Sequence, residues 1–223
     1  MTAFLFLPKS AQPPYQVIVF YPGKGAFDRT DKEKLDVVIY WDFIIKSGRA
    51  FMYPFYKGSH GQRLRDTSGP VNTRDWLVEQ SKDLGRSIDY LEGRNDIDPN
   101  RLAYYGFSKG GWLGPIFVAV EERFKTGIFA MGGLGEGMVS LPSGQPPNFA
   151  PRINIPMLMV NGKEDVIFPY ETSQVPLYKL LGTSEEDKKH ITYPGGHHVI
   201  GSSRVQMQKD IIAWLDKYLG PVD

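Results

Sequence analysis

The sequence predicts one α/β domain, a doubly wound and mostly parallel sheet with helices on both faces. Three observations predict it. Short apolar runs bounded by Gly and Pro alternate with longer segments of helical spacing. The length of 223 residues suits a single core. The composition, with 41% hydrophobic and 23% charged residues, is that of an ordinary globular protein. A parallel crossover needs a long connection, which a helix supplies. We therefore expect a single domain over residues 1–223.

Seven runs rich in apolar, aromatic and β-branched residues are the predicted strands. They are residues 3–7, 17–21, 50–56, 102–105, 127–131, 156–160 and 190–193. The first run lies in MTAFLFLPKS, which we interpret as a strand because Pro8 ends it early and neither a basic leader nor a small-residue cleavage site accompanies it. No apolar run is long enough to predict a membrane span.

Five longer segments with helical spacing separate these strands. They are residues 32–46, 74–94, 110–123, 171–181 and 205–219. Asp31 and Thr73 suit helix N-caps, and Gly48 and Gly182 suit helix ends. The remaining stretches 57–72 and 132–152 are irregular, and loops of that length in a compact domain are often functional.

The charge balance argues against polyanionic partners. Lys and Arg number 26 against 25 Asp and Glu, so no net field attracts nucleic acid or an anionic membrane. There are no cysteines, which excludes disulfides and thiolate chemistry. The lack of cysteines does not determine the compartment, because cytosolic and exported proteins can both lack them. The lack of a signal peptide favours the cytoplasm. We find no Walker sequence, no H-E-x-x-H and no carboxylates at metal-ligand spacing, and GGLGEG at 132–137 lacks the G-x-G-x-x-G spacing. We expect neither a metal nor a cofactor.

The motif GFSKG, residues 106–110, carries the first chemical signal. The pattern G-x-S-x-G is meaningful where a strand feeds a helix through a turn so tight that the serine is strained and its flanking positions need glycine. Here DIDPNR, expected to be a turn, leads into a predicted strand, and a predicted helix follows the motif. Ser108 is therefore a candidate nucleophile.

A serine nucleophile requires a base and a carboxylate that orients the base, in the chain order Ser, Asp or Glu, His. The strand at 156–160 runs into NGKEDVIFP, which offers Glu164 and Asp165, and the next strand runs into GGHHVIG. We prefer Asp165 because a shorter carboxylate suits a fixed hydrogen bond to an imidazole, and we expect Glu164 to be solvated. His197, which follows two glycines, is the predicted base, with His198 as the alternative.

An acyl-transfer site also needs donors aimed at the developing oxyanion. One should be the backbone N–H of Lys109, whose side chain need not take part. The second should come from the loop after residues 17–21, where PGKG leaves backbone amides open. We favour the amide of Lys24, with Gly25 as the alternative.

With Ser108, Asp165 and His197 in this order, the chain resembles the α/β-hydrolase superfamily, in particular the dienelactone hydrolase and acetyl xylan esterase-like branch, which overlaps prolyl oligopeptidase-type domains. The resemblance spans nearly the whole chain and rests on FYPGKGAF, SGRAFMYPFYKG, DIDPNRLAYYGFSKGG, MLMVNGKEDVIFP and YPGGHH. It implies carboxylic ester hydrolysis through an acyl-enzyme without a cofactor. In that scheme Ser108 is the nucleophile, His197 the base and then acid, and Asp165 the residue that orients His197.

The chain departs from this family in three respects. It has no residues for the N-terminal antiparallel hairpin, which suggests the C-terminal domain of a longer chain; a complete reading frame from Met1 is the alternative. Dienelactone hydrolases use a cysteine nucleophile, absent here, which favours esterase chemistry. The oxyanion loop lacks the His-Gly-Gly of many lipases and has Tyr21-Pro22-Gly23 instead.

The predicted function is a serine carboxylesterase acting on small, short-acyl esters, with a small-molecule ester as its only expected partner. Four aromatic residues near the end of the strand at 50–56 are expected to wall a compact apolar pocket; they are Phe51, Tyr53, Phe55 and Tyr56. Two alternatives stay open. The same triad would serve a peptidase of the prolyl oligopeptidase-like type, and a hydrolase-like fold can also be a non-catalytic binding module.

Overall fold

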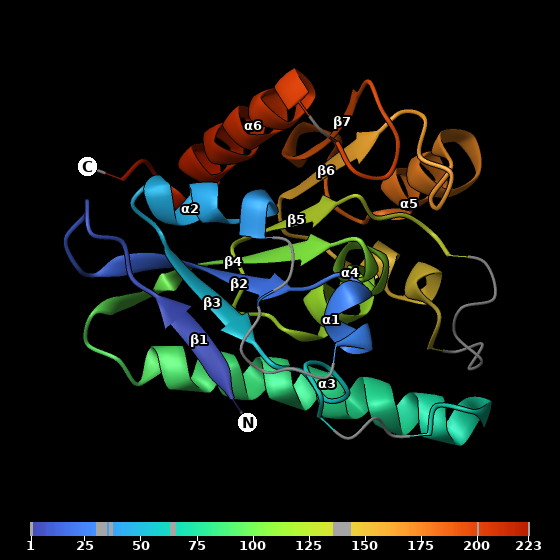
Figure 1. Cartoon of the computed structure of the whole chain (residues 1–223), viewed down its shortest axis with the longest axis horizontal. Helices are drawn as coiled ribbons and strands as arrows, with labels where there is room; N and C mark the ends of the chain where they lie inside the picture. The colour runs from blue at the N-terminus through green and yellow to red at the C-terminus, as the bar shows by residue number, and fades with distance from the viewer. Residues whose placement is uncertain are drawn as a thin grey trace.

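The computed structural model describes residues 2–29, 35, 38–62, 66–135, 144–199 and 201–222. Its centre is a seven-stranded sheet in the order β1-β3-β2-β4-β5-β6-β7 (Figure 1). The strands are β1 Ala3–Phe6, β2 Tyr15–Tyr21, β3 Ala50–Pro54, β4 Ile97–Phe107, β5 Thr126–Ala130, β6 Met157–Gly162 and β7 Lys188–Tyr193. All neighbouring strands pair in parallel except β1, which runs antiparallel to β3 at the edge of the sheet. The predicted α/β class is confirmed.

Helices cover both faces of the sheet (Figure 1). They are α1 Gly25–Asp28, α2 Asp42–Lys46, α3 Gly69–Glu92, α4 Lys109–Val120, α5 Val175–Leu180 and α6 Gly201–Leu219. Short helical turns add η1 Val38–Tyr40, η3 Pro146–Asn148, η4 Ala150–Arg152, η5 Tyr170–Gln174 and η6 Glu185–Asp187. Buried residues of α3, α4 and α5 share one apolar cluster, and those of η1, α2 and α6 share the other. The sheet is doubly wound, as predicted.

Three local predictions need correction. The segment predicted as one helix at 32–46 contains two elements, η1 and α2. They are separated at Trp41, a buried residue whose ring stacks on that of Phe51. Positions 31–34, 36 and 37, and with them the predicted cap Asp31, lie outside the described residues. Thr73 does not cap α3, which begins at Gly69, and its hydroxyl donates instead to the carbonyl of that glycine. The expected turn DIDPNR belongs to β4, although the N–H of Asn100 donates to Oδ1 of Asp98 as in a turn.

The aromatic residues of β3 and the segment after it are core residues, not pocket walls. Phe51, Tyr53, Phe55 and Tyr56 are at most 1% exposed. The rings pack on neighbouring elements, and the hydroxyl of Tyr56 donates to the carbonyl of Phe20. Since β3 lies inside the sheet with helices over both faces, its side chains have no route to solvent.

None of the described helices is both long and apolar enough to cross a membrane.

Candidate active site

Ser108 lies at the turn between β4 and α4, at the carboxyl end of the sheet. Its φ of 52° and ψ of −103° are strained for a residue with a side chain. A methyl group on Gly106 would overlap the carbonyl of Gly110, and one on Gly110 would overlap the carbonyl of Tyr21. Both glycines of the motif are therefore required by close backbone packing, which leaves the serine hydroxyl at the top of the turn.

The structure brings the three predicted triad residues together. Oγ of Ser108 lies 2.9 Å from Nε2 of His197, and Nδ1 of the same ring lies 2.8 Å from Oδ2 of Asp165. The Asp165 side chain is fully buried and that of His197 is 10% exposed. The other carboxylate oxygen, Oδ1 of Asp165, accepts the backbone N–H groups of Ile167 and Phe168. These bonds hold the carboxylate in one orientation toward the imidazole.

Glu164 has a positioning role that sequence reasoning missed. Its side chain is exposed, as expected, yet Oε2 accepts the backbone N–H of Gly195 at 2.5 Å. The Glu164 N–H in turn donates to the Gly195 carbonyl at 3.0 Å, and the N–H of Lys163 donates to the carbonyl of Tyr193. The loop that carries Asp165 is thus tied directly to the loop that carries the histidines.

His198, the alternative base, makes different contacts. Its ring packs 5.9 Å from the ring of Tyr40 and 6.0 Å from that of Phe107, and it meets the His197 ring edge-on at 5.1 Å. Aromatic stacking of this kind supports the position of the loop. Of the two histidines, His197 has the hydrogen bond to Ser108.

The predicted oxyanion loop lies against Ser108. A methyl group on Gly23 would stand 3.4 Å from Cβ of Ser108, so the loop backbone approaches the serine closely. Lys24 follows directly and precedes α1, while Lys109 is the first residue of α4. The first N–H groups of a helix have no partner within it and make its N-terminus electropositive. Both predicted amide donors therefore flank Ser108, and their role stays a prediction.

The Lys109 side chain, which need not take part in binding the oxyanion, packs beside this loop. Its Nζ lies 4.1 Å from the ring centre of Phe27 in α1 and 4.8 Å from that of Trp76 in α3. Burial, together with the charge of Lys24, lowers the pKa of Lys109 to about 8, while Asp28 opposes the shift. Sequence offers only a weak signal for this arrangement, since the two rings are far from Lys109 along the chain.

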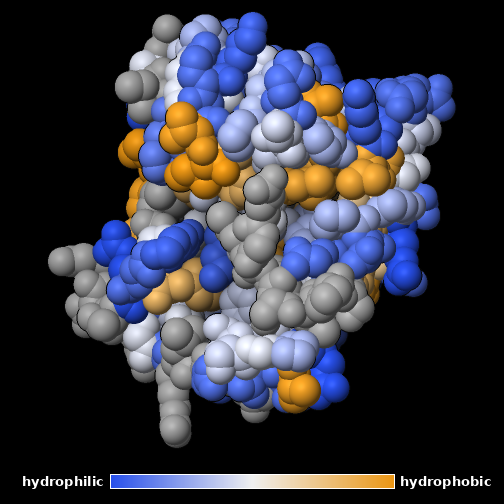
Figure 2. All heavy atoms as spheres, turned by 90° about the vertical axis from the view of Figure 1, so that its right-hand side faces the viewer, coloured by the Kyte–Doolittle hydropathy of each residue, from blue (hydrophilic) through white to orange (hydrophobic). Residues whose placement is uncertain are grey.

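The surface beside the triad exposes apolar groups. Val166 is 86% exposed and Ile167 is 50% exposed, and both directly follow Asp165. Figure 2 looks onto this end of the molecule, toward which the parallel strands run, and shows hydrophobic residues gathered in a band between hydrophilic regions. Such a surface suits the apolar part of a small organic substrate.

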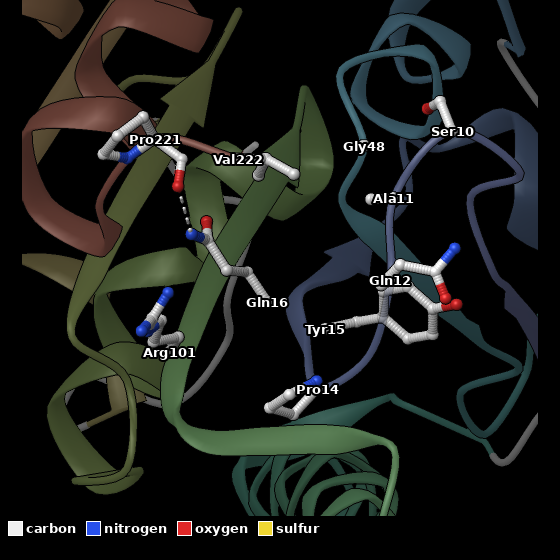
Figure 3. Close-up of a pocket in the computed structure, with 10 residues that line it drawn as sticks. All are labelled: Ser10, Ala11, Gln12, Pro14, Tyr15, Gln16, Gly48, Arg101, Pro221 and Val222. Atoms are coloured by element: carbon white, nitrogen blue, oxygen red, sulfur yellow. Dashed lines mark hydrogen bonds between the residues drawn. The ribbon is translucent and has the colours of Figure 1, made fainter.

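A separate cavity of about 310 Å³ lies at the opposite end of the sheet, close to the start of β2 (Figure 3). Tyr15, Gly48 and Arg101 line it, and the side-chain amide of Gln16 donates to the carbonyl of Pro221 at its edge. Because Tyr15 begins β2, Gly48 precedes β3 and Arg101 lies in the first half of β4, the cavity is remote from Ser108. Within the described residues no group of three or more His, Asp or Glu could hold a metal ion.

A mostly parallel sheet of this order, with a strained serine between β4 and α4 and an aspartate and a histidine following later strands, defines an α/β hydrolase. A family model described as PETase, PET hydrolase-like, matches residues 71–221. The chain belongs to that family.

The curated relatives that match are longer proteins whose names describe them as uncharacterized. The uncharacterized protein YfhR of Escherichia coli O157:H7 is 27% identical over 133 residues, which cover 52% of this chain and 45% of YfhR. The uncharacterized peptidase YuxL of Bacillus subtilis is 22% identical over 205 residues, which cover 77% of this chain and 30% of YuxL. The chain thus matches less than half the length of either relative.

Solved structures of esterases share the fold. Est1E of Butyrivibrio proteoclasticus, solved with ferulic acid bound, has a TM-score of 0.73 at 16% identity and covers 98% of this chain and 95% of its own. A putative dienelactone hydrolase of Klebsiella pneumoniae has a TM-score of 0.73 at 19% identity, covering 97% and 92%. The acetyl xylan esterase of Paenibacillus sp. R4 has a TM-score of 0.72 at 18% identity, covering 97% and 79%. At these identities the likeness establishes the fold alone. That fold is the α/β-hydrolase fold that the sequence motifs indicated.

Proposed function

We propose that this hydrolase is a serine carboxylesterase that cleaves small, short-acyl esters through an acyl-enzyme. The observation that carries the proposal is the continuous hydrogen-bonded chain from Ser108 through His197 to Asp165. A serine hydroxyl becomes nucleophilic when a base takes its proton, and the base works best when a carboxylate fixes its orientation.

In the proposed reaction Oγ of Ser108 attacks the ester carbonyl as Nε2 of His197 takes the hydroxyl proton. The carbonyl oxygen becomes an oxyanion, which the backbone N–H groups of Lys24 and Lys109 stabilise. His197 then gives the proton to the leaving alcohol, and the acyl group stays on Ser108. A water molecule, activated by the same imidazole, releases the acid and restores the serine.

The burial of Asp165 supports its proposed role. Its carboxylate is out of water yet accepts two backbone N–H groups besides the imidazole, so both of its oxygens have hydrogen-bond partners. A charged Asp165 stabilises the imidazolium that forms when His197 takes the serine proton.

A preference for small esters is supported by the surroundings of the triad. The exposed apolar side chains of Val166 and Ile167, which directly follow Asp165, offer an apolar contact next to it. Such a contact suits the apolar part of a small ester.

The test is hydrolysis of aryl esters of increasing acyl length, together with labelling by a fluorophosphonate and mapping of the labelled peptide. We expect the shortest esters to be cleaved fastest and the label to attach to Ser108. The variant Ser108→Ala should lower kcat by about 10⁴ to 10⁶-fold. Ser10→Ala, an exposed serine outside the site, is the control and should retain activity.

Two results would overturn the proposal. Labelling at another residue would remove Ser108 as the nucleophile, and turnover of no ester would leave the fold as a binding module. Because YuxL is named a peptidase, the substrate panel includes aminoacyl anilides. Faster cleavage of these amides than of the matched esters would make peptidase the better assignment.

A further inference from the structure

The side-chain ammonium of Lys109 occupies an unusual place for a cation. Lys109 is the first residue of α4 and directly follows Ser108. Its Nζ lies over the faces of two rings, 4.1 Å from the centre of Phe27 and 4.8 Å from the centre of Trp76. Aromatic faces attract a cation, more strongly where water is excluded. The two rings therefore hold the charge beside α1 and α3.

Few opposite charges balance this ammonium. Within the described part of the chain Lys109 makes no ion pair, and Asp28, a carboxylate whose charge acts on it, pairs with Lys24 at 2.6 Å. From α3, Asp75 beside Trp76 is paired with Arg74. A cation is also disfavoured at a helix N-terminus, where the macrodipole is positive. A half-buried cation that no described carboxylate pairs with is costly to keep in this position, and a bound anion would relieve that cost.

The proposed reaction places the acyl group on this side of the nucleophile. The leaving alcohol must face His197, which donates a proton to it, whereas the acyl group stays bonded to Ser108 after the alcohol has gone. Lys109 is the next residue in the chain and its backbone amide is a proposed oxyanion donor. Its side chain reaches Phe27 in α1, the helix that follows the predicted oxyanion loop, which makes it a candidate to meet the acyl part of the substrate.

We propose that the Lys109 ammonium, held between Phe27 and Trp76, is a specificity element that favours esters whose acyl group ends in a carboxylate. The inference rests on the proposed ester hydrolysis and names the substrate class of the same site. The carboxylate supplies an ion pair that no described residue gives to Lys109, and the two rings contact the apolar carbons between the carboxylate and the ester. An uncharged acyl group gains nothing from the ammonium.

The experiment compares two esters that share one leaving group and one acyl length. They are 4-nitrophenyl hydrogen glutarate, which carries a free carboxylate, and 4-nitrophenyl methyl glutarate, in which that group is neutral. The spontaneous rate of each is subtracted. We expect the ratio of kcat/KM, charged over neutral, to be about 10 or more at pH 7, which corresponds to about 1.4 kcal/mol.

Variants locate the preference. Lys109→Met should bring the ratio to about 1, and Lys109→Arg should keep a part of it because the positive charge remains. Lys82→Met removes an equally charged residue from an exposed position of α3 and should leave the ratio unchanged. This control separates a local contact from the general effect of net charge.

A pH series on the unaltered protein tests the role of the Lys109 charge without a substitution, so it does not depend on whether a variant folds. The pKa of Lys109 is about 8, so the ammonium is charged at pH 7 and largely neutral at pH 9.5. The substrate carboxylate stays ionised throughout, and any other effect of pH on the hydrolytic step changes both rates alike and cancels in the ratio. The ratio should therefore fall as the pH rises through about 8, and it should also fall with added salt.

The outcomes distinguish this inference from the function it rests on. Hydrolysis of the neutral ester with a ratio near 1 in the unaltered protein, or an unchanged ratio in Lys109→Met, would overturn the role of Lys109 and leave the esterase in place. A ratio that does not change between pH 7 and 9.5 would do the same. Hydrolysis of neither ester would overturn the esterase and this inference together.

Discussion

Gly162, the last residue of β6, packs directly against the carbonyl oxygen of Gly196, the residue before His197. A methyl group at position 162 would overlap that oxygen and the carbonyl of Gly195 as well. Because backbone atoms cannot yield as a flexible side chain does, the absence of a side chain on Gly162 sets how closely the histidine loop approaches the sheet.

Gly162→Ala is therefore expected to displace His197 from Ser108. Overpacking of this kind costs about 1 to 3 kcal/mol of stability, and a shift of the base should lower kcat by about 10 to 100-fold. Thermal unfolding and ester hydrolysis measure the two effects. Gly196→Ala is the matched control, since its new methyl group would meet nothing closer than the Glu164 carbonyl at 3.8 Å. Equal behaviour of the two variants would contradict this account of the loop.

Single alanine variants separate the two adjacent histidines. His197→Ala removes the group hydrogen-bonded to Ser108 and should lower the acylation rate by about 10³-fold or more. His198→Ala removes ring contacts with Tyr40 and Phe107, so it should mainly reduce the melting temperature. Burst kinetics with a 4-nitrophenyl ester report acylation directly. A larger loss of acylation in His198→Ala would reassign the base.

Substitutions of the two adjacent carboxylates, Asp165 and Glu164, should likewise differ in their effect on kcat. Asp165→Asn places an amide where Oδ2 meets Nδ1 of His197 and should lower kcat by about 10² to 10⁴-fold, because the imidazole loses its preferred tautomer. Glu164→Gln keeps an oxygen that can accept the Gly195 N–H, so kcat should change by less than about threefold. The measurement is steady-state hydrolysis at saturating ester. Similar losses in both variants would exclude Asp165 as the specific partner of the base.

His190 makes stability depend on pH. Burial lowers its pKa from 6.5 to about 4, so the folded state disfavours the protonated ring. The contribution of His190 is complete above pH 6.5 and is lost as the pH falls toward 4, because the unfolded chain binds the proton more readily. We expect a loss on the order of 1 to 3 kcal/mol over that range. Denaturant unfolding at several pH values measures it.

The variant His190→Gln provides the comparison. Glutamine does not titrate in this range, so the slope of unfolding free energy between pH 6.5 and 4 should be smaller than in the unaltered protein. The side chain of Gln can still meet Oδ1 of Asn161, which lies 3.2 Å from Nε2 of His190. An unchanged slope would show that other groups account for the acid sensitivity.

Local sequence signals predicted the elements well where one physical rule dominated. All seven predicted strands overlap an observed strand, since each is a short apolar run that the sheet buries. The turn at Ser108 was predictable because only glycine fits on either side of it. The prediction of one helix at 32–46 was wrong, since the burial of Trp41 against Phe51 overrides helical spacing there.

The candidate site was predictable as residue types in chain order, and less so as contacts. Ser108 and His197 are separated by 89 positions, and their proximity depends on parallel strands that end at one edge of the sheet. The hydrogen bond from Gly195 to Glu164 and the position of the Lys109 side chain were not foreseen. No local rule signals them, because each joins segments that meet only in the folded chain.

By itself, the sequence determined the α/β class, the order of strands and helices and the residues that offer nucleophile, acid and base chemistry, because these follow from local periodicity, glycine sterics and residue type. Only the tertiary structure decided which histidine meets Ser108, which aromatic residues are core and where the Lys109 charge lies. These depend on which groups are withdrawn from water and which distant segments pack together, and both are properties of the whole fold.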